Sequence, residues 1–153
     1  MPQPLSRQSH HCWTVLVAVI VFCAATLAAA QTQAADKTHD AAWERGRYLV
    51  DDVARCGQCH TPRDSNGNED RARPLAGGAL WLNSAQPVAD WPLMAPRIGG
   101  VIAASDDDLV RLLTTGIWKD GNRLRAPMPQ FRFTPDDAKA VVIYLRTVRP
   151  RQH

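Results

Sequence analysis

A five-residue segment, Cys56-Gly57-Gln58-Cys59-His60, places two thiols and an imidazole within little more than one helical turn. Side chains three residues apart lie on the same side of a helix, so both sulfur atoms face one direction and the next side chain turns beneath them. The chain has two other cysteines, Cys12 and Cys23, and both lie close to the N-terminus. The fold must therefore present these two thiols and this imidazole together.

The first 30 residues have the three-part layout of a secretory signal. Polar sequence containing Arg7 leads into an apolar run over Trp13–Cys23, and Ala28–Ala30 supply the small residues at which a signal peptidase cuts. We predict cleavage after this segment and a periplasmic location. An anchor in the inner membrane that faces the periplasm is the alternative, because the apolar stretch approaches the roughly 18 to 20 residues that span a bilayer.

The rest of the chain is predicted to form one domain. Residues 31–39 are small and polar, which is typical of a flexible leader, and residues 40–150 form the expected domain. After cleavage Cys56 and Cys59 are the remaining cysteines, which excludes a disulfide framework. The formal net charge of +3 is too small to indicate nucleic-acid binding. Membrane association is expected only if the N-terminal segment is retained.

Helix signals define the fold class. Ser105 and the three aspartates after it begin one short helix, which Gly116 ends, and Thr134-Pro135 begins a second that ends before Pro150. Apolar residues at three- and four-residue spacing predict another helix from Asp40 to about Arg55. Thr61–Ile102 is rich in proline and glycine and is predicted to be irregular, and no alternating strand pattern is convincing. We predict an all-α domain with about three main helices and long loops.

The C-x-x-C-H pattern is typical of covalent haem attachment. The two thiols add across the vinyl groups of one haem, and the histidine binds its iron. Three other interpretations are a dithiol redox centre, half of a zinc site and a structural disulfide. A thioredoxin-like centre requires a preceding strand, whereas a helix is predicted before Cys56, and a zinc site requires two further ligands. The sequence therefore predicts one haem c held by Cys56 and Cys59, with His60 as an iron ligand.

Met128 is the predicted second iron ligand. It lies between Pro127 and Pro129, which restrict the backbone and lower the entropy cost of holding a thioether against iron. Met94 is the alternative, although it is expected to contact the pocket or the core. A histidine and methionine pair implies a relatively high redox potential, which suits electron transfer rather than chemistry at an open iron position.

Aromatic and basic residues near these ligands have two interpretations each. The candidates to line the haem crevice are three tryptophans, Trp81, Trp91 and Trp118. Ordinary hydrophobic packing is the alternative role for them. Three arginines flank the Met128 loop, where they either steer an acidic partner or cover a solvated loop: Arg123, Arg125 and Arg132.

These motifs resemble the class I c-type cytochromes, and in particular the small periplasmic cytochromes that accompany bacterial dehydrogenases. The resemblance covers about Trp43 to Arg149 and includes the haem motif, Pro96-Arg97-Ile98-Gly99, Pro127-Met128-Pro129 and Tyr144-Leu145. It implies that Pro96 accepts a hydrogen bond from the His60 ring, which fixes the imidazole. It also implies that Gly46 and Tyr48 pack against Tyr144.

The expected function is one-electron transfer in a periplasmic respiratory or dehydrogenase-linked chain, with no catalytic residue. Expected partners are a dehydrogenase as donor and an oxidase or another cytochrome as acceptor. A first alternative is a permanent electron-transfer subunit of a dehydrogenase complex. A second is a haem enzyme or gas sensor with an open sixth iron position, against which Met128 argues.

Overall fold

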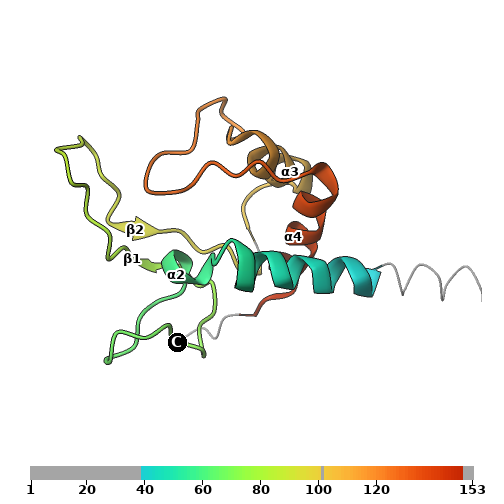
Figure 1. The fold of residues 1–153 in the computed structure, drawn as a ribbon, viewed down its shortest axis with the longest axis horizontal. Coiled ribbons are helices and arrows are strands. Elements are labelled where there is room, and N and C mark those ends of the chain that lie inside the picture. The colour runs from blue at the N-terminus through green and yellow to red at the C-terminus, as the bar shows by residue number, and fades with distance from the viewer. Residues whose placement is uncertain (1–38, 101, 150–153) are drawn as a thin grey trace, which may run out of the picture. The chain divides into compact units, whose positions relative to one another are not determined.

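The computed structural model describes residues 39–100 and 102–149. The predicted signal, nearly all of the predicted leader and Pro150 lie outside these residues. Residues 39–48 are helical, and the elements that follow are the π-helical turn η1 (Leu49–Val53), α2 (Gly57–His60), β1 (Gly78–Ala79), β2 (Met94–Ala95), α3 (Asp106–Thr115) and α4 (Pro135–Thr147). Figure 1 shows helices joined by long loops, with one short two-stranded sheet, which confirms the predicted all-α class. Among the described residues, no helix is both long enough and apolar enough to cross a membrane.

α3 and α4 begin at the predicted residues because a side chain caps each of them. The Ser105 hydroxyl accepts a hydrogen bond from the Asp108 backbone N–H at 3.1 Å and donates one to the Asp108 carboxylate at 2.8 Å. Thr134 accepts in the same way from the Asp137 N–H at 3.2 Å. Gly116 ends α3 with a φ of 74°, a left-handed conformation that glycine adopts without strain.

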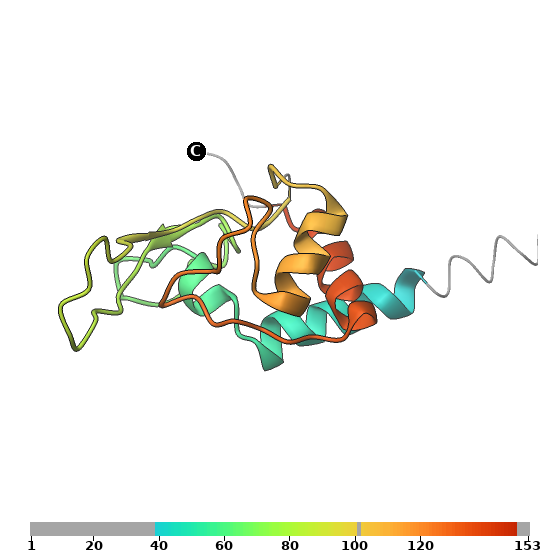
Figure 2. The same ribbon diagram turned by 90° about the horizontal axis from the view of Figure 1, so that it is seen from above.

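The core lies where the first helix crosses α4, beside α3 (Figures 1 and 2). Gly46 permits this crossing, because an added Cβ would collide with the Ala140 carbonyl and lie 2.9 Å from the Tyr144 Cβ. Apolar side chains from both helices and from the loop after α2 fill the contact: Leu49, Val50, Leu75, Val141 and Leu145. This core holds one end of the Cys56–His60 motif in place.

An aromatic contact and an ion pair also join the first helix to α4. The rings of Trp43 and Tyr144 meet edge to face with centroids 5.3 Å apart. Arg45 forms a two-point ion pair with Asp137, at 2.8 and 3.2 Å. Tyr48, which the resemblance placed against Tyr144, is instead half exposed below the Arg45 guanidinium. Trp43 therefore makes the aromatic contact with Tyr144 that the resemblance implied for Tyr48.

The first helix widens before it reaches the motif. Asp40 lies within the helix rather than capping it, and residues 49–53 form a π-helical turn in which the Ala54 N–H donates to the Leu49 carbonyl at 2.8 Å. Such turns are uncommon in proteins, and those that do occur often lie at functional sites. Arg55 then takes a positive φ of 52°. The sequence predicts an ordinary α-helix here, whereas the structure has a wider turn that ends at Val53, three residues before Cys56.

A short hairpin interrupts the segment that was predicted to be irregular. β1 pairs antiparallel with β2, with Gly78 opposite Ala95, and Figure 1 shows the connecting loop projecting away from the helices. The Gly77 N–H donates to the His60 carbonyl at 2.7 Å, and an added Cβ at Gly77 would lie 2.8 Å from the Arg97 nitrogen. The base of the hairpin is thereby fixed directly against the motif.

Candidate cofactor site

A mainly apolar cavity of about 870 Å³ opens beside α2. Its walls come from the motif, the β2 strand, α3, α4 and the loop between α3 and α4. Cavities that hold small molecules and cofactors have volumes of roughly 300 to 1,000 Å³. The apolar lining includes Val50, Ile98, Leu109, Leu113 and Phe131. The cavity therefore matches a large apolar cofactor in size and character.

The motif presents its three functional side chains to this cavity. α2 is a single helical turn, in which the His60 N–H donates to the Cys56 carbonyl at 3.0 Å. Cys56, Cys59 and His60 all line the cavity, and neither cysteine forms a disulfide. The helical spacing predicted that these side chains would share one direction, and the structure has them on one wall.

The His60 ring is buried and oriented by a backbone carbonyl. His60 is only 6% exposed, and its Nδ1 lies 2.7 Å from the Pro96 carbonyl oxygen. Because that oxygen can only accept, Nδ1 carries the proton and Nε2 is left with a lone pair. Burial lowers the pKa of His60 and the Pro96 hydrogen bond partly offsets this, so the imidazole is neutral at pH 7. A neutral, oriented imidazole is the form that binds a metal ion.

The chemistry of Cys56 disfavours the other interpretations of the motif. Burial raises the pKa of the Cys56 thiol to about 11, so the thiol is protonated at neutral pH. Dithiol redox centres depend instead on a thiol whose pKa is lowered. Within residues 39–100 and 102–149, no group of three or more His, Cys, Asp or Glu side chains is placed to hold a metal ion. Cys56 is therefore not the activated thiol of a dithiol centre, and the described residues offer no three-ligand set for zinc.

The two methionines lie in different parts of the cavity wall. Met128 follows a turn in which its N–H donates to the Arg125 carbonyl at 3.1 Å, and its side chain is partly buried. Met94 is 62% exposed on β2, two residues before the Pro96 carbonyl that holds His60. Met94 thus belongs to the wall that supports the histidine, whereas Met128 is supplied by a separate loop.

The tryptophans divide between the cavity and the surface. Trp118 lines the cavity, as one interpretation of the sequence predicted. Trp91 donates its ring N–H to the Leu82 carbonyl at 3.0 Å, and Trp81 is 57% exposed. Sequence reasoning missed Phe131, which lines the cavity and stacks on Phe133 with centroids 5.1 Å apart. The loop that carries it has no periodicity from which its direction could be inferred.

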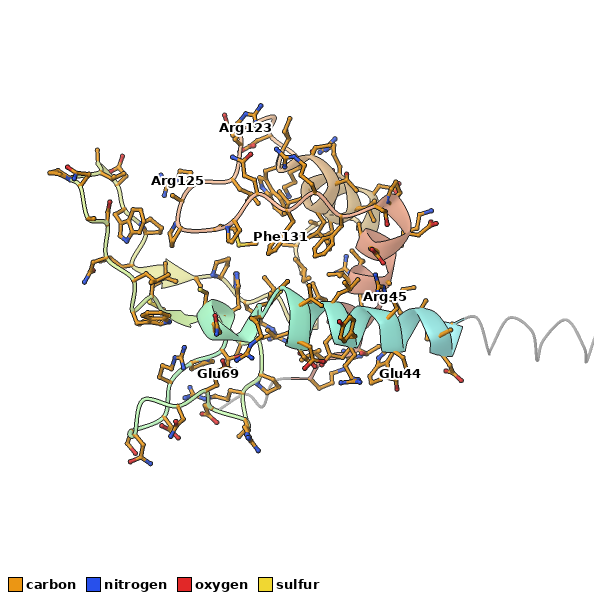
Figure 3. All side chains as sticks on the ribbon, viewed as in Figure 1. Glu44, Arg45, Glu69, Arg123, Arg125 and Phe131 are labelled. Atoms are coloured by element: carbon orange, nitrogen blue, oxygen red, sulfur yellow. The ribbon has the colours of Figure 1, made fainter. Side chains whose placement is uncertain are left out.

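Three arginines and one carboxylate, Asp120, are the charged side chains on the cavity lining. The arginines are Arg97, Arg123 and Arg125, and Figure 3 shows the last two on the loop after α3. In the described part of the chain, none of these three forms an ion pair with a carboxylate. Several basic residues on the helices are paired instead: Arg45, Arg47, Arg111, Lys139 and Arg146. The cavity side therefore has an excess of unneutralised guanidinium groups.

Comparisons with known proteins agree with this geometry. The family model for cytochrome c matches residues 43–149. The chain is 38% identical over 119 residues to the fructose dehydrogenase cytochrome subunit of Gluconobacter japonicus, a match that covers 74% of this chain and 23% of that protein. It is 33% identical over 116 residues to a diheme cytochrome c-type protein of Cereibacter sphaeroides, covering 69% of this chain and 35% of the relative.

A third relative is the cytochrome c subunit of the quinone-dependent alcohol dehydrogenase of Gluconacetobacter polyoxogenes. It is 31% identical over 115 residues, covering 69% of this chain and 24% of the relative. The matched region thus spans about a quarter to a third of the length of these relatives.

Proposed function

Because the chain belongs to the cytochrome c family, we propose that it carries single electrons on one haem c attached through Cys56 and Cys59. One observation carries this proposal: both thiols, the oriented imidazole of His60 and the thioether of Met128 line the same apolar cavity. The two cysteines would hold the haem, and His60 and Met128 would bind its iron. When bound, the haem iron supplies a centre that gains or loses one electron.

The residues of the chain would hold the haem iron in a fixed position and shield it from water. The Pro96 carbonyl holds the His60 ring in one tautomer, and the Pro127 and Pro129 rings stiffen the loop that brings in Met128. Apolar side chains on the walls exclude water. A ligand set that stays in place during electron transfer requires little rearrangement, and two protein ligands leave no open position for a substrate. The chain is therefore proposed to be a carrier and not a catalyst.

The names of the relatives suggest where this carrier works. Two of them are cytochrome subunits of fructose and alcohol dehydrogenases. We infer that this chain is exported to the periplasm, accepts electrons from a dehydrogenase and passes them to an oxidase or another cytochrome. Arg97, Arg123 and Arg125 form no ion pair among the described residues and outnumber Asp120 on the cavity lining, which favours partners with acidic contact surfaces. A permanent subunit and a diffusing shuttle both fit this role.

Haem stoichiometry tests the proposal. The full chain is exported in a bacterial host that has haem-maturation machinery. The mass of the denatured protein, which keeps only covalently bound haem, and the iron content per chain are then measured. We expect one covalently bound haem and one iron per chain. The double variant that combines Cys56→Ser with Cys59→Ser should abolish covalent haem attachment. The matched control Cys12→Ser should leave attachment unchanged. A chain without covalent haem, or with two haems, would refute the proposal.

A further inference from the structure

One carbonyl of the motif lacks its helical partner. In a longer helix the Gln58 carbonyl would accept from the N–H four residues later, but that residue is Pro62, which has no N–H. Two side chains bind this oxygen instead. Arg63 donates from Nη2 at 2.8 Å, and Trp81 donates from its ring N–H at 3.2 Å.

The Arg63 guanidinium is fixed at this position from several sides. The Trp81 ring centroid lies 6.0 Å from its central carbon, a cation–π distance, and Nη1 also contacts the Gly67 carbonyl at 3.4 Å. Among the described residues no carboxylate forms an ion pair with Arg63. A full positive charge is therefore held against the backbone between the two cysteines, with no carboxylate paired to it.

The same loop places a negative charge on the neighbouring part of the motif. Glu69 is the antiparallel bridge partner of Arg63, and an added Cβ at Gly57 would lie 2.8 Å from the Glu69 Oε2. Figure 3 shows Glu69 beside α2, on the loop that follows it. The absence of a side chain at Gly57 thus leaves room for a carboxylate, and the bridge holds opposite charges near Gln58 and Gly57.

We propose that Arg63 and Glu69 set the redox potential of the site in opposite directions: Arg63 stabilises the reduced state and Glu69 the oxidised state. This inference rests on the proposed haem attachment at Cys56 and Cys59. Reduction lowers the positive charge at the iron by one. A fixed cation nearby therefore favours the reduced form, and a fixed anion opposes it. Trp81 acts as a positioning residue that keeps the guanidinium in place.

The test is the midpoint potential of the haem-loaded full chain, measured by spectroelectrochemistry at low and high salt. Arg63→Gln removes the charge but keeps a donor. We expect this variant to have an equilibrium constant for reduction that is roughly three- to tenfold lower. For one electron this corresponds to a midpoint potential lower by about 28 to 59 mV. Arg63→Lys should stay close to wild type, and Glu69→Gln should shift the potential upward. Both shifts should shrink at high salt, because ions screen partly exposed charges.

Arg71→Gln is the matched control, because Arg71 is an exposed arginine of the same loop. It should leave the potential unchanged. The inference is overturned if Arg63→Gln behaves like Arg71→Gln, if Arg63→Lys shifts as far as Arg63→Gln, or if Glu69→Gln shifts the potential downward. If Arg63→Gln fails to retain haem, the direction of the shift in midpoint potential in Glu69→Gln decides: an upward shift supports the inference and a downward shift overturns it. Wild-type chain without covalent haem refutes the proposed function itself, whereas unmoved potentials in haem-loaded variants refute this inference alone.

Discussion

Replacing Gly46 by alanine tests the helix crossing on which the core depends. The new methyl group would collide with the Ala140 carbonyl and lie 2.9 Å from the Tyr144 Cβ. Both obstacles belong to or adjoin the α4 backbone, so no flexible side chain can move aside. Overpacking costs about 1 to 3 kcal/mol of stability, and the cost should lie near 3 kcal/mol here because backbone atoms cannot move aside. The higher helix propensity of alanine offsets about 1 kcal/mol of this cost. The net loss should be about 2 kcal/mol.

Thermal unfolding of the haem-loaded protein measures this loss. A destabilisation of about 2 kcal/mol corresponds to a fall in Tm of about 8 to 16 °C for a small domain. Glu44→Ala is the control on the same helix, because Glu44 is exposed and its ion pair with Arg47 lies at the surface, where solvent screens it (Figure 3). If Gly46→Ala raises the Tm, as expected for an open helix position, the close crossing is wrong.

Three further predictions concern interactions on the helices. Arg146→Met should lower the free energy of unfolding in urea by about 2 kcal/mol, because the Arg146 guanidinium binds two loop carbonyls and Asp106. A loss below about 0.5 kcal/mol would contradict this. Arg45 lowers the pKa of Asp137, so this carboxylate stabilises the fold above its unfolded pKa and less as pH falls. Asp137→Asn should therefore flatten the decline of stability below about pH 4, and an unchanged pH profile would contradict it. Thr134→Ala should cost about 1 kcal/mol by circular dichroism melting, and an unchanged melting curve would refute the cap.

The parts of the fold that were predictable from sequence are those with local chemical signals. Ser105 and Thr134 mark the starts of α3 and α4 because their hydroxyls cap backbone N–H groups within three residues. Gly116 marks an end because it tolerates positive φ. The motif likewise predicts its own geometry, because one helical turn is sufficient to align Cys56 and Cys59.

The remaining features depend on contacts between distant residues. The π-helical turn has no local signal in Leu49–Val53, and two of its residues, Leu49 and Val50, pack in the core with distant residues of α4. The β1–β2 hairpin has strands of only two residues, too short for an alternating pattern. The sequence makes Trp81 a candidate to line the haem crevice, whereas its ring N–H binds the Gln58 carbonyl 23 positions away. Pro62 indicates that this carbonyl lacks a helical partner, but no pattern in the sequence indicates that the hairpin supplies one.

The most direct test of the central claim is the optical spectrum of the oxidised, exported protein and two variants. Covalent haem bound by His60 and Met128 predicts a weak ferric iron-to-thioether band in the wild type. The band should persist in Met94→Ala, because Met94 lies on the wall that supports His60, and should vanish in Met128→Ala. A band that persists in Met128→Ala, or a wild-type chain without covalent haem, would contradict the account.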